Sequence, residues 1–149
     1  MHMQKIRIIS FRDLHVYQLS YELMILVFNE VLSKLPDYEK YDLFSQLCRS
    51  IKAIPRLIAE GFAKRNQKLG FQKYLYDSLA ESNETIVGLD QCRDLYKINP
   101  ELVNNLIDKY DKVSRQTYNL LKAWDRIKSV KPKTSNVTEN DTENRLTKK

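Results

Sequence analysis

The sequence predicts an all-α protein that folds as an antiparallel, up-down-up-down four-helix bundle. It has 149 residues with only three glycines and four prolines, and 30% of its residues are charged, whereas β-rich folds need more turn residues. Apolar residues also recur at spacings of three and four in four separate stretches, which is the period of one helix face. We therefore expect one domain over residues 1–130, with helices at about 13–35, 39–63, 67–96 and 100–128.

The first predicted helix carries two apolar stripes, one more than a bundle helix needs. The regular stripe, which stops before Pro36, comprises Leu14, Tyr17, Tyr21, Met24, Phe28, Val31 and Leu35. The second stripe comprises Val16, Leu19, Leu23 and Leu26. Because a helix that is apolar on most of its circumference is buried on most of it, we expect the second stripe to pack against another subunit. The alternative is a single wide stripe inside one subunit.

The other three predicted helices each carry one apolar stripe. The members are Phe44, Leu47, Ile51, Ile54 and Ile58 in the second helix; Phe71, Leu75, Ser78, Ser82, Thr85, Leu89, Cys92 and Tyr96 in the third; and Val103, Leu106, Tyr110, Val113, Thr117, Leu120, Trp124 and Ile127 in the fourth. Three central members of the third stripe are small, so we expect another helix to approach closely there.

Particular residues predict where the helices bend, begin and end. Pro55 lies inside the second helix and should kink it, and Gly61 should allow that helix to end. Asn66 is a candidate cap for the third helix. Asn99 followed by Pro100 is typical of a helix start and should open the fourth.

Other features predict a reduced, cytoplasmic protein with a polar tail. Residues 131–149 are rich in Ser, Thr, Asn, Glu and Lys and should be disordered. We expect Cys48 and Cys92 to be reduced core residues, with a disulfide between them as the weaker alternative. The N-terminal residues do not resemble a secretion signal, and no apolar run reaches the length of about 18 residues that a membrane span needs.

The positive charge of the chain is concentrated between Arg49 and Lys73. This window holds seven Lys or Arg residues and one acid, Glu60, while the rest of the chain holds 18 basic and 18 acidic residues. The cations are Arg49, Lys52, Arg56, Lys64, Arg65, Lys68 and Lys73. A local excess of this kind favours polyanions, so we expect these seven side chains to contact phosphates of nucleic acid. The alternative is a solvated helix face that is rich in Lys and Arg.

The sequence offers little that could support catalysis. Its only histidines are His2 and His15, and it has no Glu-x-x-His pair, Cys-x-x-Cys motif or glycine-rich phosphate loop. Asp77, Glu81 and Glu84 share a helix face and could ligate a metal, but we expect them to pair with basic residues of the second helix instead. We therefore predict a protein that is not an enzyme and holds no metal or cofactor.

Four segments of the chain resemble one family of bacterial proteins. They are Phe-Arg-Asp-Leu-His-Val-Tyr at 11–17, Gln-Leu followed by Arg at 46–49, Ile-Pro and then Ile-Ala-Glu-Gly-Phe within 54–62, and Ser-Leu-Ala-Glu followed by Glu-Thr within 78–85. These resemble, in order, motifs of the four-helix-bundle proteins encoded in intervening sequences of 23S ribosomal RNA genes. Ala53 and Leu57 depart from that pattern, where the family tends to have Ser and Asn. The family is similar in fold to the accessory variability determinant of diversity-generating retroelements, and the resemblance implies a homopentameric barrel with a basic surface and no catalytic residues.

Two functional hypotheses follow. The first is a non-enzymatic, oligomeric accessory protein that binds RNA or DNA through the seven cations. The second is a structural adaptor whose basic face docks an acidic protein, such as a reverse transcriptase, or a ribosomal component. A third and less favoured hypothesis is a metalloprotein that binds its ion through carboxylates.

Overall fold

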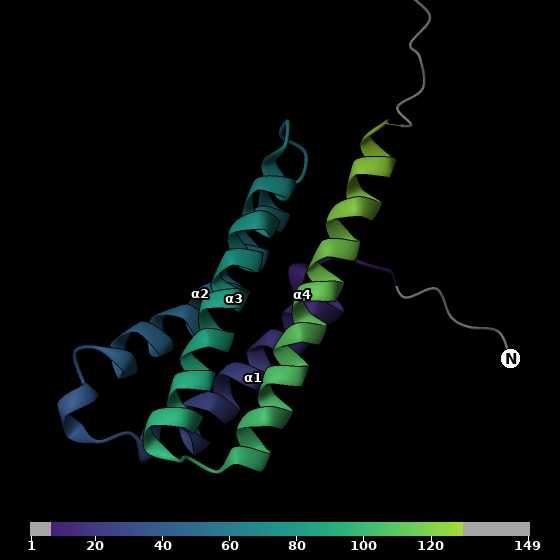
Figure 1. Ribbon diagram of the computed structural model, residues 1–149. Coiled ribbons are helices and arrows are strands. Elements are labelled where there is room, and N and C mark those ends of the chain that lie inside the picture. The colour runs from purple at the N-terminus through teal and green to yellow at the C-terminus, as the bar shows by residue number, and fades with distance from the viewer. Residues whose placement is uncertain (1–6, 130–149) are drawn as a thin grey trace, which may run out of the picture.

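The computed structural model describes residues 7–129, which form a bundle of four α-helices (Figure 1). The helices are α1 (His15–Glu30), α2 (Leu43–Ala63), α3 (Gly70–Tyr96) and α4 (Pro100–Ser129), with short 3-10 turns at Phe11–Asp13, Leu32–Lys34 and Asp37–Glu39. Each helix runs opposite to its neighbours: α3 packs on α2 and α4, and α1 packs on α2 and α4. The structure confirms the predicted all-α four-helix fold. The tail predicted to be disordered, 131–149, lies outside the described residues.

The first helix is shorter than its apolar pattern predicts. It ends at Glu30, and two 3-10 turns lead from Leu32 to Glu39 before α2 begins at Leu43. The helical conformation is disfavoured before a proline, and Leu35 is accordingly extended, with φ −69° and ψ 144°. The Glu39 carboxylate accepts a hydrogen bond of 3.0 Å from the Leu43 amide and so satisfies a free donor at the start of α2.

Both stripes of α1 contribute to the core of the subunit: Leu14, Val31 and Leu35 of the first stripe are buried as predicted, but so are two members of the second. Val16 and Leu23 are 3% and 1% exposed within the single chain, so they pack in the core of their own subunit rather than against another. Tyr21 and Phe28, expected in the core, are nearly half exposed. The inward face was missed because Ser20 interrupts its apolar pattern. The Ser20 hydroxyl donates to the Tyr17 carbonyl at 2.9 Å, which offsets the cost of its burial.

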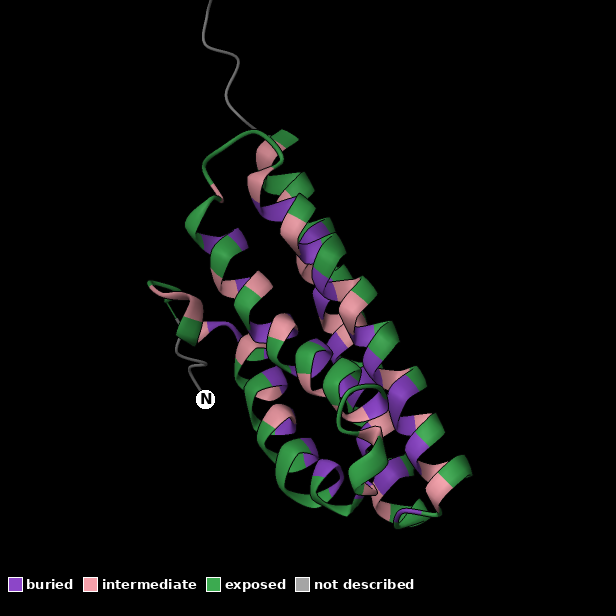
Figure 2. Ribbon diagram, turned by 90° about the vertical axis from the view of Figure 1, so that its left-hand side faces the viewer, coloured by how far each residue is buried: buried purple, intermediate pink, exposed green. Residues whose placement is uncertain are grey.

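Small residues let α2 and α3 approach closely, as expected. The hydroxyls of Thr85 and Ser50 lie 2.9 Å apart and form a buried hydrogen bond between the two helices. A Cβ atom added to Gly88 would lie 3.1 Å from Cδ1 of Leu47. Figure 2 shows that the buried residues lie on the faces that the helices turn toward one another.

The end of α2 and the start of α3 differ from the prediction. Gly61 does not end α2, which continues to Ala63; a Cβ atom at Gly61 would lie only 2.7 Å from Cβ of Tyr74. Glycine is needed there because α3 passes so close. Asn66 does not cap α3, which starts at Gly70 after Leu69 adopts a left-handed conformation with φ 54°.

The structure agrees with the predictions for Asn99 and Pro55. Asn99 caps α4 as predicted, since its side-chain oxygen accepts from the Leu102 amide at 3.2 Å. Pro55 lies inside α2, where its missing N–H removes one backbone hydrogen bond. The first part of α2 runs out beside α3 and the rest lies behind it, so the helix changes direction along its length (Figure 1).

One end of the bundle is built from three helices, because α1 has 16 residues whereas α3 has 27. Aromatic rings fill the core at this end. Phe71 makes edge-to-face contacts with Phe62 and Trp124, with ring centroids 6.0 and 5.1 Å apart. We call this part the three-helix end; it comprises the last turns of α2 and α4, the first turns of α3 and the α2–α3 turn.

The cysteines form no disulfide with each other. Cys92 is buried and Cys48 is half-buried, and both are free thiols. Burial, aided by the nearby Glu39 carboxylate, raises the pKa of the Cys92 thiol to about 11. None of the helices described is long and apolar enough to cross a membrane.

Candidate nucleic-acid interface

The outer face of α2 carries three of the predicted phosphate ligands. Arg49, Lys52 and Arg56 are exposed, whereas Ile51 and Ile54 between them are fully buried. The spacing of three and four therefore places the cations on the solvent side of α2, as predicted.

Arg49 differs from the other two because carboxylates of α3 hold it. Its guanidinium donates to Glu81 at 3.0 Å and to Glu84 at 2.7 Å. These contacts raise the pKa of the Arg49 guanidinium, which stays charged at any relevant pH. With two anions beside it, Arg49 adds little net positive potential to this face, so it suits a phosphate less than the sequence suggests.

The same contacts bear on the acidic residues of α3. Glu81 and Glu84 pair with Arg49 of α2, as expected, whereas Asp77 forms no ion pair within 4.0 Å among residues 7–129. Within residues 7–129, no three His, Cys, Asp or Glu side chains gather closely enough to hold a metal ion.

Two cations after α2 are anchored to aromatic residues. The Lys64 ammonium donates to the Tyr74 hydroxyl and lies 4.7 Å from the centre of its ring. That hydrogen bond raises the pKa of Lys64. The Arg65 guanidinium lies 4.1 Å over the Phe62 ring and donates to the Phe62 carbonyl at 2.9 Å. Both side chains therefore help to fix the α2–α3 turn.

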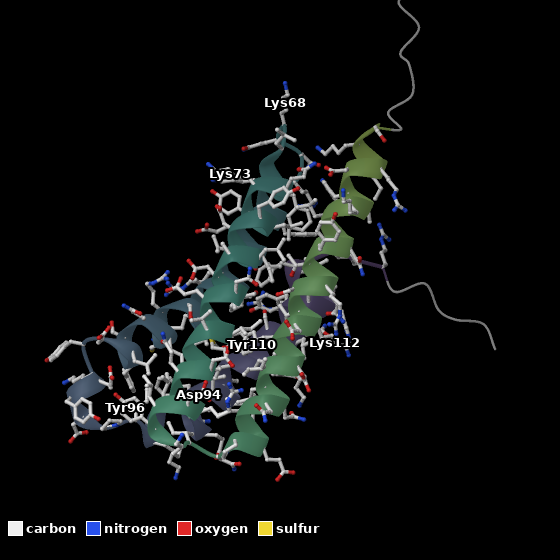
Figure 3. All side chains as sticks on the ribbon, in the orientation of Figure 1. Lys68, Lys73, Asp94, Tyr96, Tyr110 and Lys112 are labelled. Carbon is white, nitrogen blue, oxygen red and sulfur yellow. The ribbon has the colours of Figure 1, made fainter. Side chains whose placement is uncertain are left out.

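Lys68 and Lys73 complete the set at the three-helix end. Both side chains are exposed and extend from this end of the bundle (Figure 3). Arg56 and Lys64 are eight residues apart, which corresponds to about 12 Å along a helix. The cations thus form two groups, one on α2 and one at the three-helix end, rather than one compact patch; we call the two groups together the basic edge.

Six of the seven cations have no acidic partner in the part of the chain that the structure describes. Only Arg49 and Arg93 form ion pairs within 4.0 Å there, and Arg93 lies at the other end of α3. We call Lys52, Arg56, Lys68 and Lys73 the free cations, because within residues 7–129 their side chains form no ion pair and no hydrogen bond; the Lys52 ammonium lies 6.0 Å from the centre of the Phe28 ring.

Three aromatic residues of α1 that lie near Lys52 were not predicted as part of the site. Helical spacing predicts that Tyr17, Tyr21 and Phe28 lie in the core. In the structure they lie on the flank of α1 that borders Lys52, where Tyr17 is half-buried and Tyr21 and Phe28 are exposed. The available signal was the second stripe of α1, because a helix that buries Val16 and Leu23 must leave part of its first stripe exposed.

Two hollows lie on this edge of the bundle, on either side of Lys52 and Arg56. The first, between α1 and α2, has a volume of about 400 Å³ and is lined by Phe11, Tyr17, Tyr21, Met24, Lys52, Pro55, Arg56 and Ala59. The second, beside the start of α2, has a volume of about 490 Å³ and is lined by Lys40, Tyr41, Phe44, Ser45, Cys48, Arg49, Lys52 and Arg56.

Fold and site together define a class of protein: an all-helical bundle with a basic edge flanked by aromatic side chains. The chain belongs to the 23S rRNA-intervening sequence protein family, whose model matches residues 12–119. This is the family that the four sequence motifs resemble. No curated protein matches the chain.

Proposed function

We propose that this protein is a non-enzymatic, self-associating accessory protein that binds RNA or DNA through its basic edge. The observation that carries the proposal is the absence of carboxylates within 4.0 Å of Lys52, Arg56, Lys68 and Lys73 among residues 7–129. A cation without an acidic partner can neutralise a phosphate and release the counterion that the phosphate held, which favours binding.

The seven cations divide into three roles within this proposal. The free cations contact phosphates. Lys64 and Arg65 keep the turn in shape and add charge, since aromatic and carbonyl groups hold them. Arg49 joins α2 to α3 through Glu81 and Glu84.

Self-association is the second part of the proposal. Of the four residues predicted at the subunit interface, Leu26 is exposed and Leu19 is half-buried, so these two remain candidates. Ile25 beside them is also exposed. Each added subunit brings a formal charge of +6, so a pentamer of the kind implied by the family resemblance would strengthen phosphate binding.

The test is a binding titration by fluorescence anisotropy with labelled RNA and DNA of 20 nucleotides at several salt concentrations. One variant replaces the free cations by glutamine: Lys52→Gln, Arg56→Gln, Lys68→Gln and Lys73→Gln. A matched control replaces three exposed lysines and one exposed arginine of α4: Lys109→Gln, Lys112→Gln, Arg115→Gln and Lys122→Gln. Lys112 lies on the far side of α4 from Lys73 (Figure 3).

Affinity should fall steeply with salt for the wild type and the control. In the first variant, the slope of log K against log salt should shrink by about 0.7 to 0.9 for each phosphate that the protein no longer neutralises. Equal slopes in both variants would reject the basic edge as the binding surface. If the wild type fails to bind RNA or DNA, yet retains an acidic protein from lysate after nuclease digestion, the adaptor function replaces this proposal.

A further inference from the structure

Lys52 and Arg56 form a ridge between the two hollows, and both residues line both of them. Each hollow offers aromatic surface and the ridge offers positive charge. This alternation is not evident in the sequence, because Tyr17 and Tyr21 come from α1 and Tyr41 from the segment before α2, whereas the two cations come from α2.

Aromatic contacts hold the first hollow in shape. The ring of Phe11 packs edge-to-face on that of Tyr17, with ring centroids 4.9 Å apart. The ring centroids of Tyr17 and Tyr21 are 5.9 Å apart. Tyr21 is the outermost of the three and is 45% exposed. Its ring is therefore supported by Tyr17 while much of its surface remains open to solvent.

The second hollow has a similar composition. Tyr41 is among the most exposed aromatic side chains described, and the Lys40 ammonium lies 5.4 Å from the centre of its ring. Phe44 lines the same hollow and is half-buried against the core. Arg49 also borders it, but Glu81 and Glu84 hold this side chain.

We propose that the ridge and its two hollows bind one dinucleotide step of a single-stranded nucleic acid. Lys52 and Arg56 hold the phosphate, and the bases on either side of it enter the two hollows, with one base stacking on Tyr21. This inference rests on the proposed function and adds to it a preference for unpaired bases.

Charge and shape favour this occupant over others. A purely apolar partner would bury two cations that have no acidic partner among the described residues, which is costly, whereas a phosphate compensates them. A duplex keeps its bases stacked and paired, so it can reach the ridge but not fill the hollows. Single strands present unstacked bases that bind aromatic rings without much sequence preference.

The test compares three labelled oligonucleotides: a ten-nucleotide single strand, the same strand with abasic sites, which has the same number of phosphates, and the ten-base-pair duplex, which has twice as many. The key variant is Tyr21→Leu, with Tyr21→Phe to retain the ring. Tyr118→Leu is the matched control, because Tyr118 is 46% exposed and has the Lys122 ammonium 5.2 Å from its ring, but lies on α4. Circular dichroism and sedimentation verify the fold and the subunit number of each variant.

The wild type should bind the normal single strand about tenfold more tightly than the abasic strand. Tyr21→Leu should lose most of this difference, while Tyr21→Phe and Tyr118→Leu keep it. Equal affinity of the wild type for normal and abasic strands would overturn the inference, even if Tyr21→Leu did not fold. If Tyr21→Leu alters subunit number and leaves the preference unchanged, another copy of the chain covers the hollow and the inference is wrong.

Failure of this inference is distinguishable from failure of the proposed function. If binding depends on salt and on the free cations but not on bases, the basic edge binds phosphates alone and only the inference fails. If no strand binds at low salt, both fail.

Discussion

The guanidinium of Arg49 and the carboxylate of Glu81 face each other in parallel across α2 and α3. Nη1 of Arg49 lies 3.0 Å from Oε1 of Glu81, and Nη2 lies 3.2 Å from Oε2. Two parallel hydrogen bonds fix both position and orientation, which a single contact does not. The pair thus connects the two helices directly beside the ridge formed by Lys52 and Arg56.

This pair should contribute modestly and in a salt-dependent way to stability. The Arg49 side chain is 55% exposed, so solvent screens the interaction, and Arg49→Gln should lower the free energy of unfolding by about 1 kcal/mol or less. A double-mutant cycle with Glu81→Gln, followed by urea denaturation at low and high salt, measures the coupling. Lys52→Gln is the control and should show no such decrease. A coupling that is unaffected by salt would contradict this view.

Gly61 should tolerate a methyl group poorly. In Gly61→Ala the new Cβ would lie 2.7 Å from Cβ of Tyr74, and because that atom is attached to the α3 backbone it cannot rotate away. We expect a decrease of about 1 to 3 kcal/mol in the free energy of unfolding, measured by urea denaturation. Gly88→Ala is the comparison: its new Cβ meets the flexible end of Leu47 at 3.1 Å and should cost less. Equal decreases would mean that the helices can separate at Gly61.

Tyr110 carries a buried hydroxyl without a hydrogen-bond partner among the residues described, and it lies in the middle of the bundle (Figure 3). Tyr110→Phe removes this unsatisfied group, so stability should stay unchanged or rise by about 1 kcal/mol. A clear decrease in stability on urea denaturation would show that the hydroxyl has a partner. The exposed Tyr118→Phe is the control.

The same residue should contribute to alkaline unfolding. Burial raises the pKa of Tyr110 above its ordinary value of 10.0. The folded state therefore keeps this proton where the unfolded state loses it, so stability is complete below pH 10.0 and falls above it. Melting temperatures measured from neutral to alkaline pH should decline less steeply for Tyr110→Phe than for the wild type.

Glu39 should contribute to stability only when it is ionised. Its carboxylate accepts hydrogen bonds from the Tyr96 hydroxyl and the Leu43 amide, and both lower its pKa from the ordinary 4.5. The contribution is therefore present above pH 4.5 and is lost as pH falls through the lower value of the folded state. Glu39→Gln should melt below the wild type at neutral pH, and the two should converge in acid. Asp37→Asn, in the same 3-10 turn, serves as the control in thermal melts.

The fold was predictable where one stripe dominates a helix. The stripes of α2 and α4 are amphipathic over most of their length, so their buried faces followed from spacing alone. The buried face of α1 was harder to predict, because this helix is apolar on two sides and a polar residue, Ser20, lies on the side that faces the core. The start of α3 could not be predicted because Leu69 adopts a conformation that leucine rarely takes.

The candidate site was predictable in charge but not in composition. Helical spacing placed Lys52 and Arg56 on the surface of α2. We predicted that the acidic residues of α3 pair with basic residues of α2, but we still counted Arg49 among the phosphate ligands. Its charge is compensated by Glu81 and Glu84. The aromatic lining depends on which side of α1 faces outward. That side is determined by the packing of α1 against α2 and α4, which the sequence pattern of α1 alone does not reveal.

The brevity of α1 has a consequence for how the molecule opens. With one fewer neighbour, the turns around Phe62, Phe71 and Trp124 should detach at a smaller free-energy cost than the four-helix part. Hydrogen–deuterium exchange should therefore be fastest among helical amides there and slower where α1 covers α2. Lys68 and Lys73 belong to this yielding region, so a bound polyanion would protect it from exchange more than any other part of the bundle.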